Sequence, residues 1–316
     1  MMNKEKNFAS AVIYVHNAET RINEFLTAII KVMEDNFEHS EIICVNDFST
    51  DNSVQVIKDL SSNVKDTTIS LINMSSFHGV ENAMNAGVDL AIGDFVFEFD
   101  NTLLDFDLSV VMDIYRKSLE GFDIVSASPD RKERLTSNLF YKVFDRFSAL
   151  PYKMATESFR VLSRRVINRI SSINKTVPYR KAIYQNCGLK ITNIKYEVND
   201  SSTRALNRSH DLEENKYRTV LAIDSLLLFT NVGFRFSLTM TIAMMLLSVI
   251  AIFYSAVMYF FVDPVLGWTT TIVFLSISFF GLFGILTIVI KYLQLILDMT
   301  FKLKHYNFEC IEKLTK

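Results

Sequence analysis

Short apolar runs alternate with segments of helical period between Ala11 and about Glu197. Five of these runs are typical of buried strands: Ala11–Val15, Glu41–Val45, Thr68–Ile72, Asp94–Phe99 and Asp123–Ser126. Between the runs, apolar residues recur at spacings of three and four, which predicts amphipathic helices around residues 22–33, 54–60 and 108–115. Strands that alternate with helices indicate an α/β fold with a mostly parallel sheet.

The C-terminal part of the chain has a different pattern. Leu238–Val262 and Gly267–Ile290 carry no charged side chain, and each is about 25 residues long, or about 36 Å as a helix, which is enough to cross a bilayer. The turn between them contains Asp263 but no Lys or Arg, whereas Arg235 and Lys291 flank the pair. Since basic residues favour the cytoplasmic side, the pattern predicts a two-helix hairpin with both flanks in the cytosol.

These patterns divide the chain into a cytosolic α/β domain (residues 1–210), a juxtamembrane amphipathic segment (211–236) and a two-helix transmembrane anchor with a cytoplasmic tail (237–316). A helical stretch at 135–150, basic on one side, falls within the first part. The polar start of the chain runs directly into a strand, so we expect no cleavable signal peptide. Both termini are expected in the cytosol.

The composition excludes several classes of protein. Of the 316 residues, 49% are hydrophobic, which excludes a disordered or collagen-like chain. A formal net charge of -2 gives no reason to expect a nucleic-acid partner. Cys44, Cys187 and Cys310 lie far apart, form no CxxC motif and have no clustered histidines nearby, so neither a zinc site nor a disulfide framework is expected.

Polar loops follow the predicted strands, at the place where open α/β sheets bind their ligands. The loops after the first two strands contain Asn17, Glu19, Asn46, Asp47 and Asp51. Their amide and carboxylate groups can bind a base and a ribose, although a polar loop in which Thr50 or Asp51 caps a helix has the same composition. A second polar loop, at 100–105, follows the apolar strand that ends at Phe99.

Four motifs occur in a fixed order. Val45–Asp51 fits the pattern V-D-D-x-S-T-D, and Gly87 with the pair Gly93-Asp94 fits A-G-x-x-x-A-x-G-D. Arg131–Tyr141 fits R-x-x-R-x-x-S-x-x-F-Y, and Phe159–Arg165 fits F-R-L-L-x-R-R. With two predicted terminal membrane helices, this set resembles family 2 glycosyltransferases of the GT-A (Rossmann-like) fold, in particular the polyisoprenyl-phosphate branch with dolichol-phosphate mannose synthase and bactoprenol glucosyltransferases. The resemblance covers essentially the whole chain.

The resemblance implies an inverting transfer of a sugar from a nucleotide sugar, expected to be UDP-linked, to polyisoprenyl (undecaprenyl) phosphate at the inner (cytoplasmic) membrane. It implies six residues for the nucleotide: Asn17, Glu19, Asn46, Asp47, Asp51 and Asn82. The residues implied for the acceptor phosphate are Arg131, Arg134, Ser137 and Arg160, since guanidinium groups match phosphate geometry. Asp100, Ser158 and Arg160 are implied as catalytic residues. A homo-oligomer, by resemblance a tetramer, is also expected.

A divalent cation, Mg²⁺ or Mn²⁺, is implied at Asp100 and Thr102, where it would stabilise the leaving diphosphate. The family has D-x-D there, and this chain lacks the second carboxylate; Glu98 and Asp105 are other possible ligands. Ser158 also replaces an aspartate, although an acceptor phosphate is ionised near pH 7 and hardly needs a base. The alternative function is therefore a catalytically impaired member that acts as a membrane-anchored binding or assembly subunit.

A processive polysaccharide synthase is a third hypothesis. The chain contains no Q-x-x-R-W motif. Two predicted spans are also too few to form a channel for a growing polysaccharide. Both observations disfavour this hypothesis.

Overall fold

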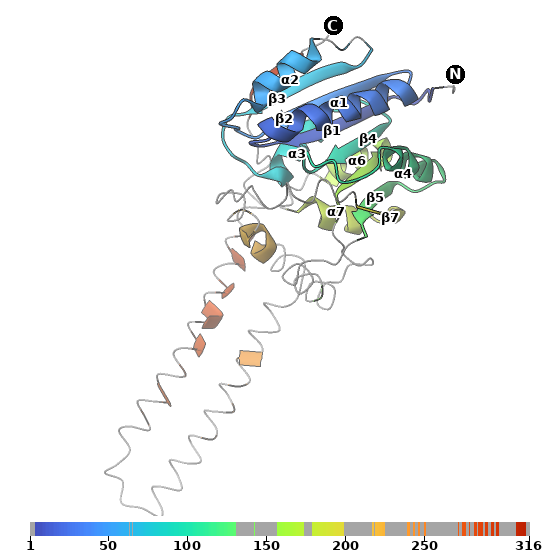
Figure 1. The fold of residues 1–316 in the computed structure, drawn as a ribbon. Helices are drawn as coiled ribbons and strands as arrows, with labels where there is room; N and C mark the ends of the chain where they lie inside the picture. Colours follow the sequence, from blue (N-terminus) through green and yellow to red (C-terminus); the bar gives the residue numbers. More distant parts are fainter. Residues whose placement is uncertain are drawn as a thin grey trace, which may run out of the picture.

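The computed structural model describes much of the chain before residue 199 and one strand near its end (Figure 1). The described ranges are 4–62, 66–130, 157–173, 179–198 and 308–313, with isolated positions elsewhere, among them 64, 142, 217 and 219–224. No helix among these residues is both long enough and apolar enough to cross a membrane. The predicted spans at 238–262 and 267–290 and the basic stretch at 135–150 lie outside the described residues, apart from isolated positions.

Eight strands form one sheet in the order β7-β5-β6-β4-β1-β2-β3-β8. Their bounds are β1 Ala9–Val15, β2 Ser40–Asn46, β3 Thr68–Met74, β4 Phe95–Phe99, β5 Ile124–Pro129, β6 Phe159–Ser163, β7 Ile191–Tyr196 and β8 Phe308–Lys313. The strands β4, β1, β2 and β3 are parallel, as are β5 and β7, whereas β6 and β8 run antiparallel to their neighbours. The five predicted strands are confirmed, and the sheet is mostly parallel as predicted, with β6 and β8 as its two antiparallel strands.

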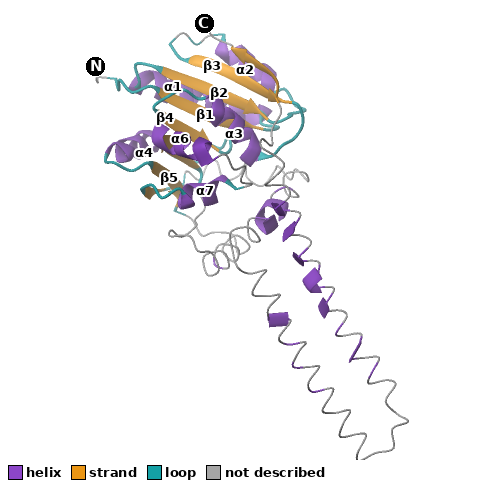
Figure 2. Ribbon diagram, turned by 180° about the vertical axis from the view of Figure 1, so that it is seen from behind, coloured by secondary structure: helices purple, strands orange, loops and turns teal. Residues whose placement is uncertain are grey.

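Helices cover both faces of this sheet (Figures 1 and 2). One face packs against α1 (Glu19–Asn36), α2 (Ser53–Ser61) and α4 (Ser109–Leu119), which are the three predicted helices. The other face packs against α3 (Val80–Leu90), α6 (Arg164–Ile173) and α7 (Arg180–Asn186), which the periodicity did not predict. Because helices lie on both sides, β1 and β2 are buried at every residue, as is typical of central parallel strands.

The register of the parallel strands brings their carboxyl ends to one edge of the sheet. Val15 at the end of β1 pairs with Asn46 at the end of β2. Ile13 of β1 pairs with Phe99 at the end of β4. The loops that follow β1, β2 and β4 therefore begin side by side, and this is the edge where open α/β sheets bind ligands.

The helix α3 lies very close to the central strands. A Cβ atom at Gly87 would come 2.3 Å from Val12 Cγ1 and 2.7 Å from Val45 Cγ2. No side chain fits at this position, so glycine allows α3 to pack against β1 and β2. This position of α3 brings Glu81, in its first turn, within reach of Arg180 on α7.

The last described segment returns to the same domain. The strand β8 pairs antiparallel with β3, with Ile311 opposite Ile72 and Cys310 opposite Asn73. These residues, which the sequence analysis assigns to a cytoplasmic tail, form an edge strand of the sheet. The strand β8 therefore lies beside β3.

Candidate functional site

The loops at the carboxyl ends of β1 and β2, residues 16–19 and 46–52, share one hydrogen-bond network, and we call them the paired loops. The backbone amide of Asn17 donates to Ser49 Oγ (3.1 Å), and Asn17 Oδ1 accepts from the amide of Thr50 (2.9 Å). The amide of Glu19 donates to Asp51 Oδ2 (2.9 Å). The fold thus brings together three of the residues predicted to bind a nucleotide.

Asp47 belongs to the second of the paired loops, and its side chain is fully buried. Its carboxylate accepts hydrogen bonds from the amides of His78 (2.8 Å) and Gly79 (2.8 Å) and from Tyr14 Oη (3.0 Å). Burial raises the pKa of Asp47, and these hydrogen bonds partly oppose that rise. Since the protein itself uses both oxygens, Asp47 fixes the loop between β3 and α3 in this structure rather than facing a ligand.

The remaining two predicted nucleotide residues flank the same region. Asn46 Nδ2 donates to Asn73 Oδ1 (2.9 Å), and Asn46 Oδ1 accepts from the amide of Ser49 (3.2 Å). Asn82 Nδ2 donates to the carbonyl of His78 (3.2 Å). All six residues therefore lie in one polar region at the ends of β1, β2 and β3.

Backbone strain marks the paired loops. In the described part of the chain, Asn17 (φ 45°) and Phe48 (φ 56°) are the two non-glycine residues with positive φ. Asparagine tolerates this conformation, but other side chains lose about 1–2 kcal/mol in it. The side chain of Phe48 is also 52% exposed, so packing does not offset its strain. Strain of this kind clusters at ligand sites, which makes the paired loops the best candidate for one.

Aromatic rings connect the paired loops to the segment predicted to precede the membrane. The ring centroids of His16 and Phe77 are 4.8 Å apart, and those of Phe77 and Tyr217 are 6.0 Å apart. A Cβ atom at Gly79 would lie 2.2 Å from the ring of Tyr217, and Gly79 has a φ of 78°. Only glycine both lacks the Cβ that would clash with Tyr217 and adopts a positive φ without strain. Tyr217, within the predicted segment 211–236, therefore packs beside the paired loops.

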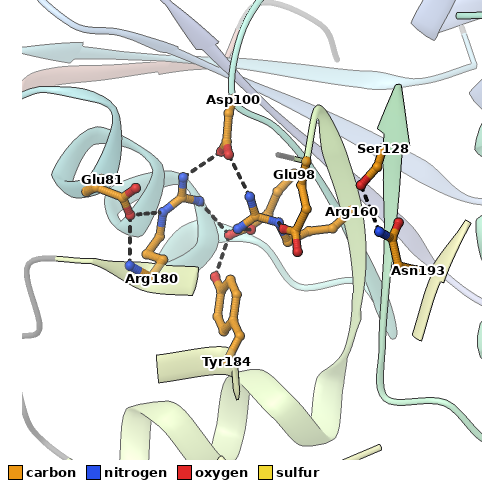
Figure 3. A network of polar contacts seen from close by, with 9 residues as sticks. Glu81, Glu98, Asp100, Ser128, Arg160, Arg180, Tyr184 and Asn193 are labelled. Carbon is orange, nitrogen blue, oxygen red and sulfur yellow. Dashed lines mark hydrogen bonds and ion pairs between the residues drawn. The ribbon is translucent and has the colours of Figure 1, made fainter. Parts of the chain in front are cut away.

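A buried cluster of opposite charges lies at the carboxyl end of β4 (Figure 3). We call it the ion-pair cluster, and it comprises Glu81, Glu98, Asp100, Arg160 and Arg180. Arg160 Nη2 lies 2.6 Å from Asp100 Oδ2, and Arg180 Nη2 lies 2.5 Å from Asp100 Oδ1. The Nη1 atoms of the two arginines lie 3.2 and 2.8 Å from Glu98, and Arg180 Nε lies 2.9 Å from Glu81 Oε2. Each guanidinium therefore bridges carboxylates from different elements.

Burial couples these charges to one another. Glu98, Arg160 and Arg180 are at most 1% exposed, whereas the side chain of Asp100 is 17% exposed. Burial alone would raise the pKa of Asp100, but the two guanidinium groups outweigh it and hold that pKa well below its usual range. Tyr184 Oη donates to Glu98 Oε1 (2.7 Å), and burial together with Glu98 raises the pKa of Tyr184. Asp100 is therefore ionised and Tyr184 protonated at neutral pH.

The residues predicted to hold Mg²⁺ or Mn²⁺ do not fit a metal ion in this arrangement. Both oxygens of Asp100 contact guanidinium groups, and Thr102 contributes no carboxylate. Both oxygens of Glu98 are engaged in the ion-pair cluster, and Asp105 Oδ1 accepts from Tyr196 Oη (3.0 Å). The described residues contain no group of three or more His, Cys, Asp or Glu side chains that could hold a metal. Hard cations require several free oxygen ligands.

Ser158, the third predicted catalytic residue, lies beside the ion-pair cluster but not in it. Ser158 Oγ contacts Tyr196 Oη at 2.6 Å, and through Tyr196 it is joined to Asp105. Of the residues predicted for the acceptor phosphate, Arg160 lies in the ion-pair cluster. The other three, Arg131, Arg134 and Ser137, lie outside the described residues.

Sequence reasoning missed three members of this region, namely Glu81, Arg180 and Tyr184. Glu98 did give a signal, since a charged residue inside a buried strand requires a partner. Arg180 gave none, because it is 80 positions from Asp100 and 99 positions from Glu81 and belongs to none of the four motifs.

Comparison with known proteins agrees with this architecture. Residues 10–171 match the family described as glycosyl transferase family 2. An uncharacterized glycosyltransferase of Synechocystis sp. is 28% identical over 194 residues, which cover 60% of each chain. The bactoprenol glucosyl transferase of Shigella phage SfV is 28% identical over 193 residues, which cover 59% of this chain and 62% of the relative. The matches thus span less than two thirds of these relatives.

Among solved structures, a mannosyltransferase from Pyrobaculum calidifontis, in complex with GDP-Man and Mn²⁺, aligns with 89% of this chain and 88% of its own. The TM-score is 0.47 and the sequence identity 14%. The mixed α/β sheet with helices on both faces agrees with a GT-A-like fold. On the match over residues 10–171, the chain belongs to glycosyl transferase family 2.

Proposed function

We propose that this protein is a membrane-anchored, inverting glycosyltransferase that moves a sugar from a UDP-linked donor to polyisoprenyl (undecaprenyl) phosphate. The observation that carries the proposal is the pair of strained polar loops at the carboxyl ends of β1 and β2. Membership of family 2 and similarity to bactoprenol glucosyl transferases support the acceptor class. The paired loops bind the base and ribose of the donor.

In the transfer, the bond between the sugar C1 and the donor phosphate oxygen breaks, and its electron pair leaves on the diphosphate. An oxygen of the lipid phosphate forms the new bond at the opposite face of C1. That oxygen is already ionised near pH 7, so no general base is required where Ser158 replaces an aspartate. Arg131 and Arg134 are proposed to bind the acceptor phosphate.

Asp100 is the most exposed member of the ion-pair cluster, so it is the member that can touch the substrate. Each oxygen of its ionised carboxylate contacts one guanidinium group and has a second lone pair, which can accept a hydrogen bond from a substrate hydroxyl group. Arg160 and Arg180 are positioning residues that fix both oxygens of Asp100. The donor set at Asp100 and Thr102 fits neither Mg²⁺ nor Mn²⁺, so the roles proposed for Asp100, Arg160 and Arg180 involve neither ion.

The membrane anchor is part of the proposal. The two uncharged stretches at 238–262 and 267–290 supply the spans. The chain leaves the sheet after β7, and β8 pairs with β3 of the same sheet. The segment between β7 and β8 therefore starts and ends on the same side of the membrane, which supports an even number of crossings. We propose the inner (cytoplasmic) membrane, with the α/β domain and both termini in the cytosol. A homo-oligomer stays a prediction.

The test incubates the full chain in detergent with undecaprenyl phosphate and a panel of nucleotide sugars, and detects sugar-phosphate lipid by mass spectrometry. We expect product from one donor and its loss in Asp51→Ala and Asp100→Ala. Asp59→Ala, an exposed aspartate on α2, is the matched control and should retain activity. Product formation that survives both site variants would contradict the proposed site.

A second candidate function has its own observation. Arg160 and Arg180 occupy both oxygens of Asp100, and Thr102 replaces the second carboxylate of the D-x-D motif. These observations also favour a catalytically impaired family member that binds nucleotide as a membrane-anchored subunit. Binding of UDP without product from any donor would select this candidate. Loss of UDP binding in Asp51→Ala would then still assign the paired loops to the nucleotide.

A further inference from the structure

Tyr217, in the juxtamembrane segment (211–236), contacts the turn between β3 and α3. A Cβ atom at Gly79 would lie 2.2, 2.3 and 2.5 Å from Cζ, Cε2 and Cε1 of Tyr217, so the ring lies directly against the Gly79 backbone. The backbone of Glu81, in the first turn of α3, forms a hydrogen bond with the Tyr217 hydroxyl. Positions 217 and 219–224 are helical. Tyr217 therefore joins a helical part of this segment to the start of α3.

Gly79, against which the Tyr217 ring packs, is also bonded to the paired loops. Its φ of 78° and ψ of 160° lie in a region that essentially only glycine adopts. The amides of His78 and Gly79 donate to the two carboxylate oxygens of Asp47, each at 2.8 Å. The ring of Tyr217 therefore covers the turn whose amides hold the Asp47 side chain.

A second path leads from Tyr217 to the same residue. The ring of Phe77 meets that of Tyr217 edge to face, with centroids 6.0 Å apart, and the centroid of His16 lies 4.8 Å from that of Phe77. His16 Nδ1 lies 2.6 Å from the carbonyl oxygen of Asp47. A carbonyl oxygen only accepts, so Nδ1 carries the proton and donates. Both paths from Tyr217 therefore end at Asp47, one at its carboxylate and one at its carbonyl.

The position of Asp47 determines the shape of the second paired loop. Before it, Asn46 Oδ1 accepts from the amide of Ser49 (3.2 Å), and after it Phe48 has the strained φ of 56°. We propose that Tyr217 is a positioning residue for nucleotide binding, which acts by holding Asp47 through Gly79 and His16. This inference rests on the proposed function for the identity of the ligand.

The proposal couples the juxtamembrane segment to nucleotide affinity. Tyr217 precedes the first predicted span, which begins at Leu238, so the proposed anchor and the Tyr217 ring belong to one continuous stretch of chain. Coupling between two sites is reciprocal in binding free energy. A seated Tyr217 raises UDP affinity, and bound UDP must then hold Tyr217 more firmly in its seat.

The first measurement is UDP affinity, by calorimetry on the full chain in detergent. Tyr217→Ala removes the ring, and we expect about tenfold weaker binding, as the loss of an aromatic contact implies. Tyr217→Phe keeps the ring and should restore most of the affinity. The matched control is Phe122→Ala: Phe122 is also partly buried, but it precedes the amino end of β5, at the opposite edge of the sheet from the paired loops. This control should leave UDP affinity unchanged.

The second measurement is hydrogen exchange by mass spectrometry, with and without saturating UDP. We expect UDP to slow exchange in a peptide that covers 217–224 as well as in the paired loops, and to leave α4 unchanged. In Tyr217→Ala with saturating UDP, the slowing should persist in the paired loops and be lost at 219–224. A ring with a merely structural role would not respond to the nucleotide. The comparison on the unmodified chain holds even where Tyr217→Ala lowers the melting temperature.

Unchanged UDP affinity in Tyr217→Ala, or exchange at 217–224 that ignores UDP, would overturn the inference and leave the proposed function standing. Equal weakening by Phe122→Ala would also overturn it, because the loss of any packed ring would then lower the affinity. Failure of UDP to bind the unmodified chain would contradict the proposed function, and this inference with it. The two failures are therefore distinguishable.

Discussion

The paired loops and the ion-pair cluster lie at the same edge of the sheet and differ in how their polar groups are satisfied. The paired loops are partly exposed, strained at Phe48 and bonded largely through backbone amides. The ion-pair cluster is buried, and Arg160 and Arg180 occupy both oxygens of Asp100. Exposed, strained loops suit ligand binding, whereas closed ion pairs suit the positioning of elements. We therefore expect substitutions in the ion-pair cluster to lower the stability of the fold, and substitutions in the paired loops to lower nucleotide affinity with little loss of stability.

The largest expected effect is on the ion-pair cluster. Arg180→Met leaves Glu81, Glu98 and Asp100 buried with one guanidinium between them. Breaking a buried ion pair from one side typically costs about 3–5 kcal/mol, so we expect a fall of that size in the free energy of unfolding. Chemical denaturation of the full chain in detergent, followed by circular dichroism, measures it.

The matched control for that variant is Arg116→Met. Arg116 pairs with Asp113 at 3.4 Å on the surface of α4, with side chains 62% and 49% exposed. Exposed pairs contribute at most about 1 kcal/mol. Equal destabilisation by Arg180→Met and Arg116→Met would contradict the claim that the buried ion pairs contribute more to stability than the exposed pair.

A smaller effect is expected from acid. The pKa of Asp100 is lower in the folded protein than the unfolded value of about 3.9. The unfolded chain therefore binds the proton more readily, so this stabilisation is complete above the unfolded pKa and is lost as pH falls toward the folded pKa. Melting temperature measured from pH 6 to pH 3 should fall, and the fall should be shallower in Asp100→Asn. Parallel curves would show that Asp100 carries no such stabilisation.

The smallest change in stability is expected at Phe48. Phe48→Gly removes about 1–2 kcal/mol of left-handed strain and adds about 0.5–1 kcal/mol of backbone entropy cost, so the domain should become slightly more stable. UDP affinity should fall several-fold, because the preformed loop is lost. Ile92→Gly is the control: Ile92 is 70% exposed without positive φ, and its variant should be destabilised. A destabilised Phe48→Gly would contradict the strain argument.

The two regions also differ in how far the sequence predicts them. Asn17 and Asp51 lie in loops that directly follow apolar runs, and parallel neighbours bring such loops together, so their proximity could be inferred. The place of β6 between β4 and β5 could not, because hydrophobic pattern does not encode the order or direction of strands. Arg180 joins Asp100 only through that tertiary arrangement, 80 positions away. Phe48 shows its strain only in the backbone dihedral.

The central claim is that the paired loops bind the nucleotide while Asp100 belongs to the ion-pair cluster and not to a metal site. The most direct measurement titrates UDP into the full chain in detergent by calorimetry, once with EDTA and once with Mn²⁺, and repeats it with Asp51→Ala. We predict the same affinity with EDTA and with Mn²⁺, and weaker binding by the variant. Tightening of UDP binding by Mn²⁺, or unchanged binding by Asp51→Ala, would contradict the account.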